Sequence, residues 1–402
     1  MPLSSDELRR YARQLVLPQL GRDGQERLRA SSVLVAGLGG LGSPVALYLA
    51  AAGVGRLGLL DFDTVALHNL HRQVLHGTAS VDDAKVDSAR RRLEDLNPHV
   101  RLDTWQTVLS SANARGIVSD YDIVVDGTDS FSTRYLINDA CVLERKPNVQ
   151  ASIHRFEGQL SVFGAESGPC YRCLHPEPPP AGSVPNCAEG GVFGVLPGLM
   201  GMLQATETLK LLLGVGDPLI GRLLIVETLG MRFREVQVER DPQCEWCATR
   251  ERTELLADYA AFCGESAAAT TAGSAAGSSA AGTEVASAAT ADAELAARRE
   301  IAPAELSMRL ARGEGLLVVD VREPWEHDVG SIEGAQLMPM QSVPAGHGSL
   351  PRDRTIVVYC HHGMRSAMVA DYLRAAGFSR VLNLEGGIDR WSVEVDPSVP
   401  RY

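Results

Sequence analysis

Residues 264–297 constrain the fold of this 402-residue chain most, because they cannot contribute to a packed core. They read GESAAATTAGSAAGSSAAGTEVASAATADAELAA, mostly Ala, Ser, Thr and Gly, without Lys, Arg or an aromatic residue. Such a segment buries too little apolar surface to offset the conformational entropy lost on folding. We therefore expect a flexible linker over residues 253–297, between domains at 1–252 and 298–402. The ends of its 264–297 stretch should lie roughly 30 Å apart on average.

The first of these domains alternates short apolar runs with segments of helical periodicity. The runs lie at 31–37, 56–61 and 121–127, and the helical segments lie at 44–53, 84–97 and 132–144. This alternation is typical of βαβ units around a parallel sheet. Later runs, at 158–164, 221–228 and 232–239, predict strands that pair antiparallel. The expected fold class is α/β, with a Rossmann-like ATP-binding domain and a mixed sheet, and a second α/β domain after the linker.

Composition argues against several kinds of partner and location. The formal net charge of −12 and the pI near 5.4 disfavour binding to nucleic acid or to an anionic membrane. The sequence has no run of ~18 apolar residues, and its charged first residues lack the apolar core of a signal peptide. We expect a cytoplasmic protein. Its eight cysteines are therefore interpreted as metal ligands or reactive thiols in preference to disulfides.

A glycine-rich turn marks a nucleotide site. GLGGLG, from Gly37 to Gly42, follows one apolar run and opens a helix, so its backbone N–H groups suit a phosphate. Asp61 ends the next run, where a carboxylate binds ribose hydroxyls. These residues alone are equally consistent with an NAD-dependent dehydrogenase.

Four further polar residues follow at strand ends or shortly after them: Asn69, Arg72, Lys85 and Asp129. Either cation by itself is more often a solvated surface charge. Together, two cations and a carboxylate suit a triphosphate with Mg²⁺ better than a nicotinamide ring.

The order of these motifs resembles the MoeB/ThiF family of ubiquitin-activating-type adenylyltransferases. The resemblance spans roughly residues 5–250 and rests on RYARQ, GLGGLG, LLDFDTV, NLHRQ, DDAKVDSA, DGTDSF and two later CxxC pairs. It implies ATP-dependent adenylation of the C-terminal Gly-Gly carboxylate of a ubiquitin-like sulfur-carrier protein. It also implies ATP contacts from Gly40, Asp61, Asn69, Arg72 and Lys85, Mg²⁺ at Asp129, and Arg13 reaching the phosphates across a homodimer interface.

Two positions depart from the family pattern. His68 stands where the family has Ser, and Ser130 stands where it has Asn; both are polar and stay among the expected nucleotide contacts. The implied reaction needs no general base, because the attacking carboxylate is already ionised at pH 7. Charge that develops on the leaving phosphates is offset by cations and Mg²⁺.

The cysteines fall into distinct groups. Cys170, Cys173, Cys244 and Cys247 form two CxxC pairs with the spacing of zinc ligands, which predicts one structural Zn²⁺, with redox dithiols or buried cysteines as alternatives. Cys187 lies in a Pro/Gly-rich loop, which favours exposure and reactivity over an inert role. The resemblance implies that it is a secondary thiol.

Near the end of the chain, CHHGMRS places Cys360 between an apolar run, TIVVYC, and a helical segment, SAMVADYLRAAG. This strand-to-helix position is typical of a nucleophile. Arg365 follows after five positions, one fewer than in the Cys-x5-Arg loop of protein tyrosine phosphatases, so the shorter loop should hold a persulfide sulfur better than a phosphate.

Together with DVREPWEH and LEGGIDRW, this loop resembles a rhodanese domain over residues 298–402. The resemblance implies a Cys360 persulfide, which the helix N-terminus and Arg365 stabilise. Its sulfur, from thiosulfate or a cysteine desulfurase, would attack the acyl adenylate. Cys187 would then release a thiocarboxylate by forming a disulfide with Cys360.

Two other functions fit parts of the sequence. One is an NAD-dependent oxidoreductase fused to a rhodanese domain. The other is a non-catalytic scaffold, stabilised by zinc, that binds a ubiquitin-like protein. For the sulfur-transfer function, the product could serve molybdopterin, thiamine, cysteine or thiolated-tRNA synthesis.

Overall fold

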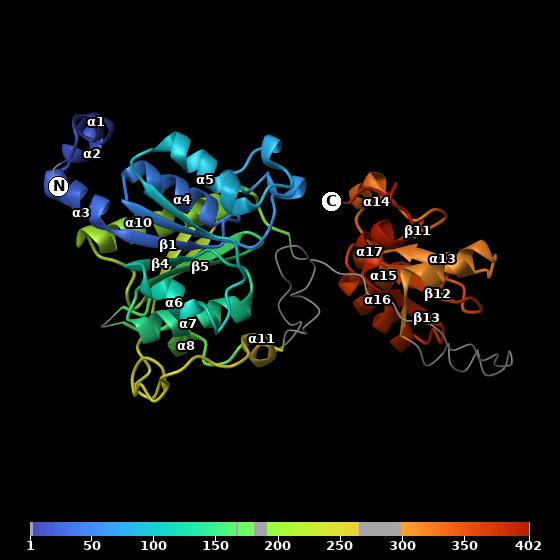
Figure 1. The fold of residues 1–402 in the computed structure, drawn as a ribbon. Helices are drawn as coiled ribbons and strands as arrows, with labels where there is room; N and C mark the ends of the chain where they lie inside the picture. Colours follow the sequence, from blue (N-terminus) through green and yellow to red (C-terminus); the bar gives the residue numbers. More distant parts are fainter. Residues whose placement is uncertain (1–2, 166–167, 181–190, 265–298, 402) are drawn as a thin grey trace. The chain divides into compact units, whose positions relative to one another are not determined.

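A computed structural model describes residues 3–165, 168–180, 191–264 and 299–401. The chain divides into two compact units, residues 1–274 and 275–402, and each is an α/β structure (Figure 1). Among the described residues, none of the helices has the length and apolar character needed to cross a lipid bilayer.

The first unit is built on one eight-stranded sheet with the order β3-β2-β1-β4-β5-β6-β7-β8. Strands β3 to β5 in this order are parallel, and β6, β7 and β8 continue antiparallel, which confirms the predicted mixed sheet. The strands are β1 Ser32–Ala36, β2 Arg56–Leu60, β3 Arg101–Trp105, β4 Ile123–Asp126, β5 Asn148–His154, β6 Glu157–Phe163, β7 Arg222–Glu227 and β8 Arg232–Gln237.

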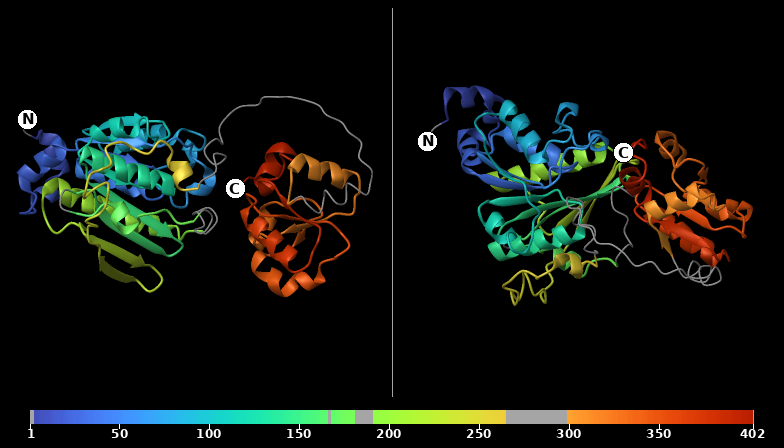
Figure 2. Two further views of the ribbon diagram at one scale, coloured as in Figure 1. Left: turned by 90° about the horizontal axis from the view of Figure 1, so that it is seen from below. Right: turned by 45° about the vertical axis from the view of Figure 1, so that its right-hand side comes forward.

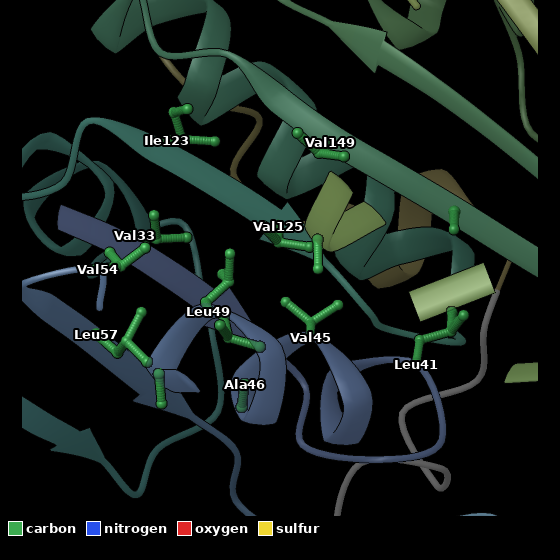
Figure 3. Close-up of a cluster of buried hydrophobic side chains, with 14 of the residues drawn as sticks. Val33, Leu41, Val45, Ala46, Leu49, Val54, Leu57, Ile123, Val125 and Val149 are labelled. Carbon is green, nitrogen blue, oxygen red and sulfur yellow. The ribbon is translucent and has the colours of Figure 1, made fainter. Parts of the chain in front are cut away.

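Helices cover both faces of this sheet, as Figure 1 shows, so its central strands are apolar throughout. In β1, Val33 and Val35 pack with α4, α5 and α10, whereas Leu34 and Ala36 pack with α6 and α7. Figure 3 shows the first of these clusters, with Val45 and Leu49 directed towards the strands. These helices are α4 Gly42–Ala52, α5 Lys85–Leu96, α6 Ala114–Ser119, α7 Phe131–Glu144 and α10 Val195–Leu213.

The segment at 194–214, which has no charged residue between Gly194 and Glu207, forms α10. Its buried face packs on α4, β5 and β6, and the Gln204 amide donates to the backbone oxygens of Asp126 and Val149, at 2.8 and 3.0 Å. Val195 and Met202 are exposed on the other side. Shorter helices of this unit are α1 Ser5–Arg10, α2 Ala12–Leu15, α3 Gly21–Ala30, α8 Tyr171–Leu174 and α11 Tyr259–Phe262.

The second unit has a parallel five-stranded sheet with the order β11-β10-β12-β13-β9 (Figure 2). Alternate residues of β12 pack on opposite faces, Ile356 and Val358 on one and Val357 and Tyr359 on the other. The strands are β9 Glu300–Ile301, β10 Leu317–Asp320, β11 Gln336–Leu337, β12 Ile356–Tyr359 and β13 Val381–Leu384. The helices are α13 Pro303–Ala311, α14 Pro324–Val329, α15 Val343–Gly346, α16 Met364–Ala375 and α17 Gly387–Glu394.

The turn between β1 and α4 requires glycine at its end. A Cβ atom at Gly42 would lie 1.8 Å from the backbone oxygen of Gly37, and Gly37 itself has a φ of +87°. This close approach brings the first turn of α4 against the end of β1.

We expect Gly42→Ala to destabilise the first unit by at least ~2 kcal/mol, because the added methyl group must displace backbone. Gly116→Ala is the matched control: a Cβ atom there meets nothing within 4 Å, so helix propensity should make the change neutral or slightly stabilising. Hydrogen-exchange mass spectrometry measures the protection of backbone amides in each unit separately. Equal protection of the first unit in both variants would contradict the steric argument.

Candidate functional site

A cavity of about 280 Å³ lies at the carboxyl end of the parallel strands in the first unit. Strands β1, β2 and β4 end here, as expected for a ligand site in an open α/β sheet. The cavity brings together seven of the residues that the sequence predicts to contact the nucleotide or its metal: Gly40, Asp61, Asn69, Arg72, Lys85, Asp129 and Ser130.

The carboxylate of Asp61 joins the glycine-rich turn to the end of β2. Its two oxygens accept the backbone N–H groups of Leu38 at 2.8 Å and Asp63 at 2.9 Å. Burial raises the pKa of Asp61, and the nearby Lys85 ammonium opposes this shift. Asp61 also lines the cavity, and its carboxylate has further lone pairs that are able to accept hydrogen bonds from ribose hydroxyls.

Lys85 begins α5 and is only 4% exposed. Its ammonium donates to Asp63 at 2.9 Å and lies 3.9 Å from Asp61. A buried ammonium held between two carboxylates is a strong local cation that a phosphate group can share.

On another wall of the cavity, Arg72 donates to the amide oxygen of Asn69 at 2.6 Å. The aliphatic part of the Arg72 side chain lies beside the glycine-rich turn, since a Cβ atom on Gly40 would lie 3.7 Å from Arg72 Cγ. The hydrogen bond to Asn69 orients the guanidinium. A guanidinium in a fixed orientation is suited to bidentate contact with phosphate oxygens.

Asp129 and Ser130 lie between β4 and α7 and line the cavity. Ser130 is the N-cap of α7: its hydroxyl accepts the N–H of Thr133 and also contacts the Thr133 hydroxyl at 2.7 Å. Asp129 is exposed, and its carboxylate oxygens are of the type that Mg²⁺ prefers. That Asp129 holds a magnesium ion stays a prediction.

Two predicted nucleotide residues lie outside the cavity lining. Arg13 is exposed on α2, and His68 is exposed in a short 3₁₀ turn at Leu67–Asn69. The contact of Arg13 with phosphates stays a prediction that requires a second copy of the chain.

Several polar residues that line the cavity were missed from the sequence, among them Arg134 and Gln73. Arg134, on α7, is 8% exposed, and its guanidinium donates to the backbone oxygen of Thr128 at 3.3 Å. Gln73 is buried, and its side-chain oxygen has no hydrogen-bond partner among the described residues. The sequence signal available for Arg134 is its position four residues after Ser130, the N-cap of α7, and this spacing does not by itself place it at the cavity.

The four cysteines of the two CxxC pairs meet in space. Cys170 Sγ lies 3.9 Å from Cys173 and 3.7 Å from Cys244, and Cys173 lies 3.4 Å from Cys247. Four sulfurs around a zinc ion at ~2.3 Å would be about 3.8 Å apart in a tetrahedron. All four ligand atoms lie within 4.8 Å of one another, so the residues present fit a structural Zn²⁺.

A buried ion pair anchors this cysteine cluster to α7. Arg172, between the first two cysteines, forms two hydrogen bonds with Asp139, at 2.8 and 2.7 Å. The Arg172 guanidinium also lies over the rings of Tyr135, Trp246 and Phe262, at 4.8 to 4.9 Å. Because Trp246 belongs to the second pair and Phe262 to α11, one cation connects segments that are far apart in the sequence.

The second unit places Cys360 directly after β12 and before α16, as the sequence predicts. The thiol is 2% exposed, and its sulfur accepts the N–H of Gly363 at 3.1 Å. The hydroxyl of Ser366, within 3.4 Å of the same sulfur, also lies 2.6 Å from the side-chain oxygen of Asn383. The loop therefore directs N–H and O–H groups at this sulfur.

Arg365 lies on the first turn of α16 and forms a bidentate ion pair with Glu326, with both N–O distances at 2.7 Å. Glu326 belongs to DVREPWEH, so this pair connects two motifs of the second unit. The effect of Arg365 on the Cys360 persulfide stays a prediction. Cys187, the predicted second thiol, lies outside the described residues.

Comparison with known proteins agrees with both halves of this description. The fold and the two sites define a protein with a Rossmann-like nucleotide-binding unit and a rhodanese-like unit. The model of the ThiF family matches residues 11–246, and that of the rhodanese-like domain matches residues 302–394. The chain belongs to the ThiF family and carries a C-terminal rhodanese-like domain.

Individual relatives support this assignment. The chain is 44% identical to "Probable adenylyltransferase/sulfurtransferase MoeZ" of Mycobacterium tuberculosis, over 100% of this chain and 96% of that relative. It is 52% identical to the "Sulfur carrier protein adenylyltransferase" of Thermus thermophilus, over 66% of this chain and 99% of that relative. A crystal structure of E. coli MccB matches with a TM-score of 0.54 and 21% identity, over 61% of this chain and 75% of that one, which supports the fold alone.

We expect Cys173→Ser to lower bound zinc well below one ion per chain and to destabilise the first unit, because structural zinc binding contributes directly to folding. Cys263→Ser, at a cysteine outside the cluster, should keep the metal. Elemental analysis and hydrogen exchange measure the two effects, and the second unit should remain protected. A folded first unit without metal would count against the zinc site.

Proposed function

We propose that this protein adenylates the C-terminal Gly-Gly carboxylate of a ubiquitin-like sulfur-carrier protein with ATP, and then transfers sulfur to it from a persulfide on Cys360. One observation carries the proposal: a single chain combines a cavity bearing Asp61, Arg72, Lys85 and Asp129 with a rhodanese loop that retains its cysteine. The printed name of the T. thermophilus relative, a sulfur-carrier adenylyltransferase, supports the same substrate class.

In the first step, the ionised carboxylate of the carrier attacks the α-phosphorus of ATP, and pyrophosphate leaves. Gly40 and its neighbours offer backbone N–H groups to the phosphates, and Asp61 binds the ribose. Arg72 and Lys85 offset the charge that grows on the leaving group, with Arg13 of a second subunit in a homodimer. Magnesium, held by Asp129, would supply further positive charge when bound.

In the second step, the outer sulfur of the Cys360 persulfide attacks the acyl carbon, and AMP leaves. Cys187 then attacks the inner sulfur, so that a Cys187–Cys360 disulfide forms and the carrier departs as a thiocarboxylate. The sulfur comes from thiosulfate or a cysteine desulfurase. Two chemistries in one chain raise the effective concentration of the persulfide near the adenylate. The proposed setting is the cytoplasm.

An NAD-dependent oxidoreductase is less consistent with the cavity, because a guanidinium and an ammonium border it and a nicotinamide ring needs a flat, uncharged pocket. A non-catalytic scaffold would not require the positive charges of Arg72 and Lys85 in this cavity. Both alternatives predict no ATP–pyrophosphate exchange in the presence of a carrier, so this assay separates them from adenylation.

Asp129→Ala should reduce carrier-dependent ATP–pyrophosphate exchange by at least ~100-fold, because it removes the carboxylate assigned to Mg²⁺. Sulfur transfer from thiosulfate to cyanide should persist, since Cys360 is in the other unit. Asp95→Ala, which removes an exposed carboxylate of α5, is the control and should leave exchange unchanged. Exchange that survives Asp129→Ala would remove Asp129 from the metal site.

Cys360→Ala should preserve adenylation but eliminate the protein persulfide and, with free sulfide excluded, thiocarboxylate formation. Cys187→Ala should preserve both adenylation and the persulfide, and should fail in releasing the thiocarboxylate. Mass spectrometry of the carrier after one turnover without reductant distinguishes these defects. An undiminished yield from Cys360→Ala would refute the two-site relay, whereas one from Cys187→Ala would refute only the second thiol's role.

A further inference from the structure

A second group of potential metal ligands lies in the rhodanese-like unit, immediately after the nucleophile. It consists of His361, His362 and Asp389, whose ligand atoms all lie within 4.8 Å of one another. His362 Nδ1 is 3.9 Å from Asp389 Oδ2, and the two imidazole rings are stacked with centroids 4.0 Å apart. The group is separate from the four cysteines of the first unit, and neither step of the proposed function uses it.

Backbone contacts hold these three residues together. The N–H groups of Ile388 and Asp389, on the first turn of α17, donate to the backbone oxygens of Cys360 and His361 at 2.9 and 3.0 Å. The approach depends on Gly387, where a Cβ atom would lie 2.3 Å from the His361 oxygen. The spacing of the ligands is therefore set by the fold, which lowers the cost of assembling a site.

The side chains suit a particular class of ion. Two imidazoles and a carboxylate are typical ligands of Zn²⁺ and its divalent transition-metal neighbours, with bonds of about 2.0–2.2 Å. Such bonds place ligand atoms roughly 3.0–3.5 Å apart. The 3.9 Å between His362 and Asp389 would have to shorten by less than about 1 Å, and no separation in the group by more than about 2 Å. His362 is half-exposed, whereas Asp389 is oriented by Arg401, whose guanidinium donates to its two oxygens at 2.7 and 3.1 Å.

We propose that His361, His362 and Asp389 bind a divalent transition metal such as Zn²⁺, and that metal binding slows the loading of sulfur onto Cys360. The two histidines belong to the loop whose Gly363 N–H contacts the Cys360 sulfur, so a metal that fixes them also restricts the groups that must receive a second sulfur. This inference rests on the proposed function only for the role of Cys360.

The affected step is the exchange of sulfur with a donor. The Cys360 thiolate attacks the outer sulfur of thiosulfate, the sulfur–sulfur bond breaks, and sulfite leaves with its electron pair. The product is the Cys360 persulfide, and the step requires no further oxidant or reductant. A zinc ion beside the loop would reduce the rate of this step reversibly.

The first experiment is calorimetric titration of ZnCl₂ into the untagged full chain, with the cysteine site already filled and loosely bound metal removed by brief chelation. We expect one further zinc equivalent. His362→Ala and Asp389→Asn should each weaken its binding at least tenfold. His154→Ala removes an exposed histidine of the first unit and should bind zinc as the unchanged protein does.

The second experiment measures persulfide loading from thiosulfate by mass spectrometry, with and without Zn²⁺, and avoids cyanide because it binds zinc. The ratio of the two rates is compared within each variant. We expect zinc to slow loading at least tenfold in the unchanged protein and in His154→Ala, with recovery on adding EDTA, and to have little effect in His362→Ala and Asp389→Asn.

The outcomes separate this inference from the proposed function. Zinc binding that is absent, or equally tight in both site variants, would overturn the metal site, and so would inhibition that persists in them. If Cys360 acquires no sulfur even without zinc, the proposed function fails, while the calorimetric result still tests the site by itself.

Discussion

The hydrogen bond from the Leu38 N–H group to the Asp61 carboxylate is the contact on which the nucleotide site depends. It connects the turn after β1 to the end of β2, and the same carboxylate orients the segment that follows through Asp63. Lys85 then lies against both acids, although it is 22 residues further on from Asp63. The site is thus assembled around one buried acid, whose charge is tolerated because backbone N–H groups and an ammonium compensate it.

Much of this arrangement was predictable from the sequence, because the residues follow strand ends in a parallel sheet. That rule alone brings Gly40, Asp61 and Asp129 to one edge, and the structure has all three in one cavity. The rule about strand ends does not predict the positions of residues inside helices. Arg134 reads as an ordinary residue of α7, and only the three-dimensional position of that helix relative to β4 brings it to the cavity. Arg13 cannot be judged from one chain, since its predicted contact belongs to a second subunit.

The four cysteines of the two CxxC pairs also show that sequence spacing does not explain how distant segments come together. Their CxxC spacing indicates zinc, but Cys170 and Cys244 are 74 positions apart in the chain, and spacing does not reveal what brings them together. The structure supplies the cause: Arg172 pairs with Asp139 and lies over aromatic rings from three segments. The sequence analysis predicted that Arg365 stabilises the persulfide, but it did not predict the ion pair between Arg365 and Glu326. Ion pairs between distant motifs leave no periodic pattern in a sequence.

The position of α11 has a consequence for how the chain is made. Tyr259 and Phe262 complete the packing around Asp139 and Arg172, so the first unit lacks part of its core until the ribosome has synthesised residue 262. The next residues, 264–297, are mostly Ala, Ser, Thr and Gly. At 5–20 residues per second, their synthesis takes roughly 2–7 s. Synthesis of this stretch therefore gives α11 and the four cysteines time to come together before the strands of the second unit are made.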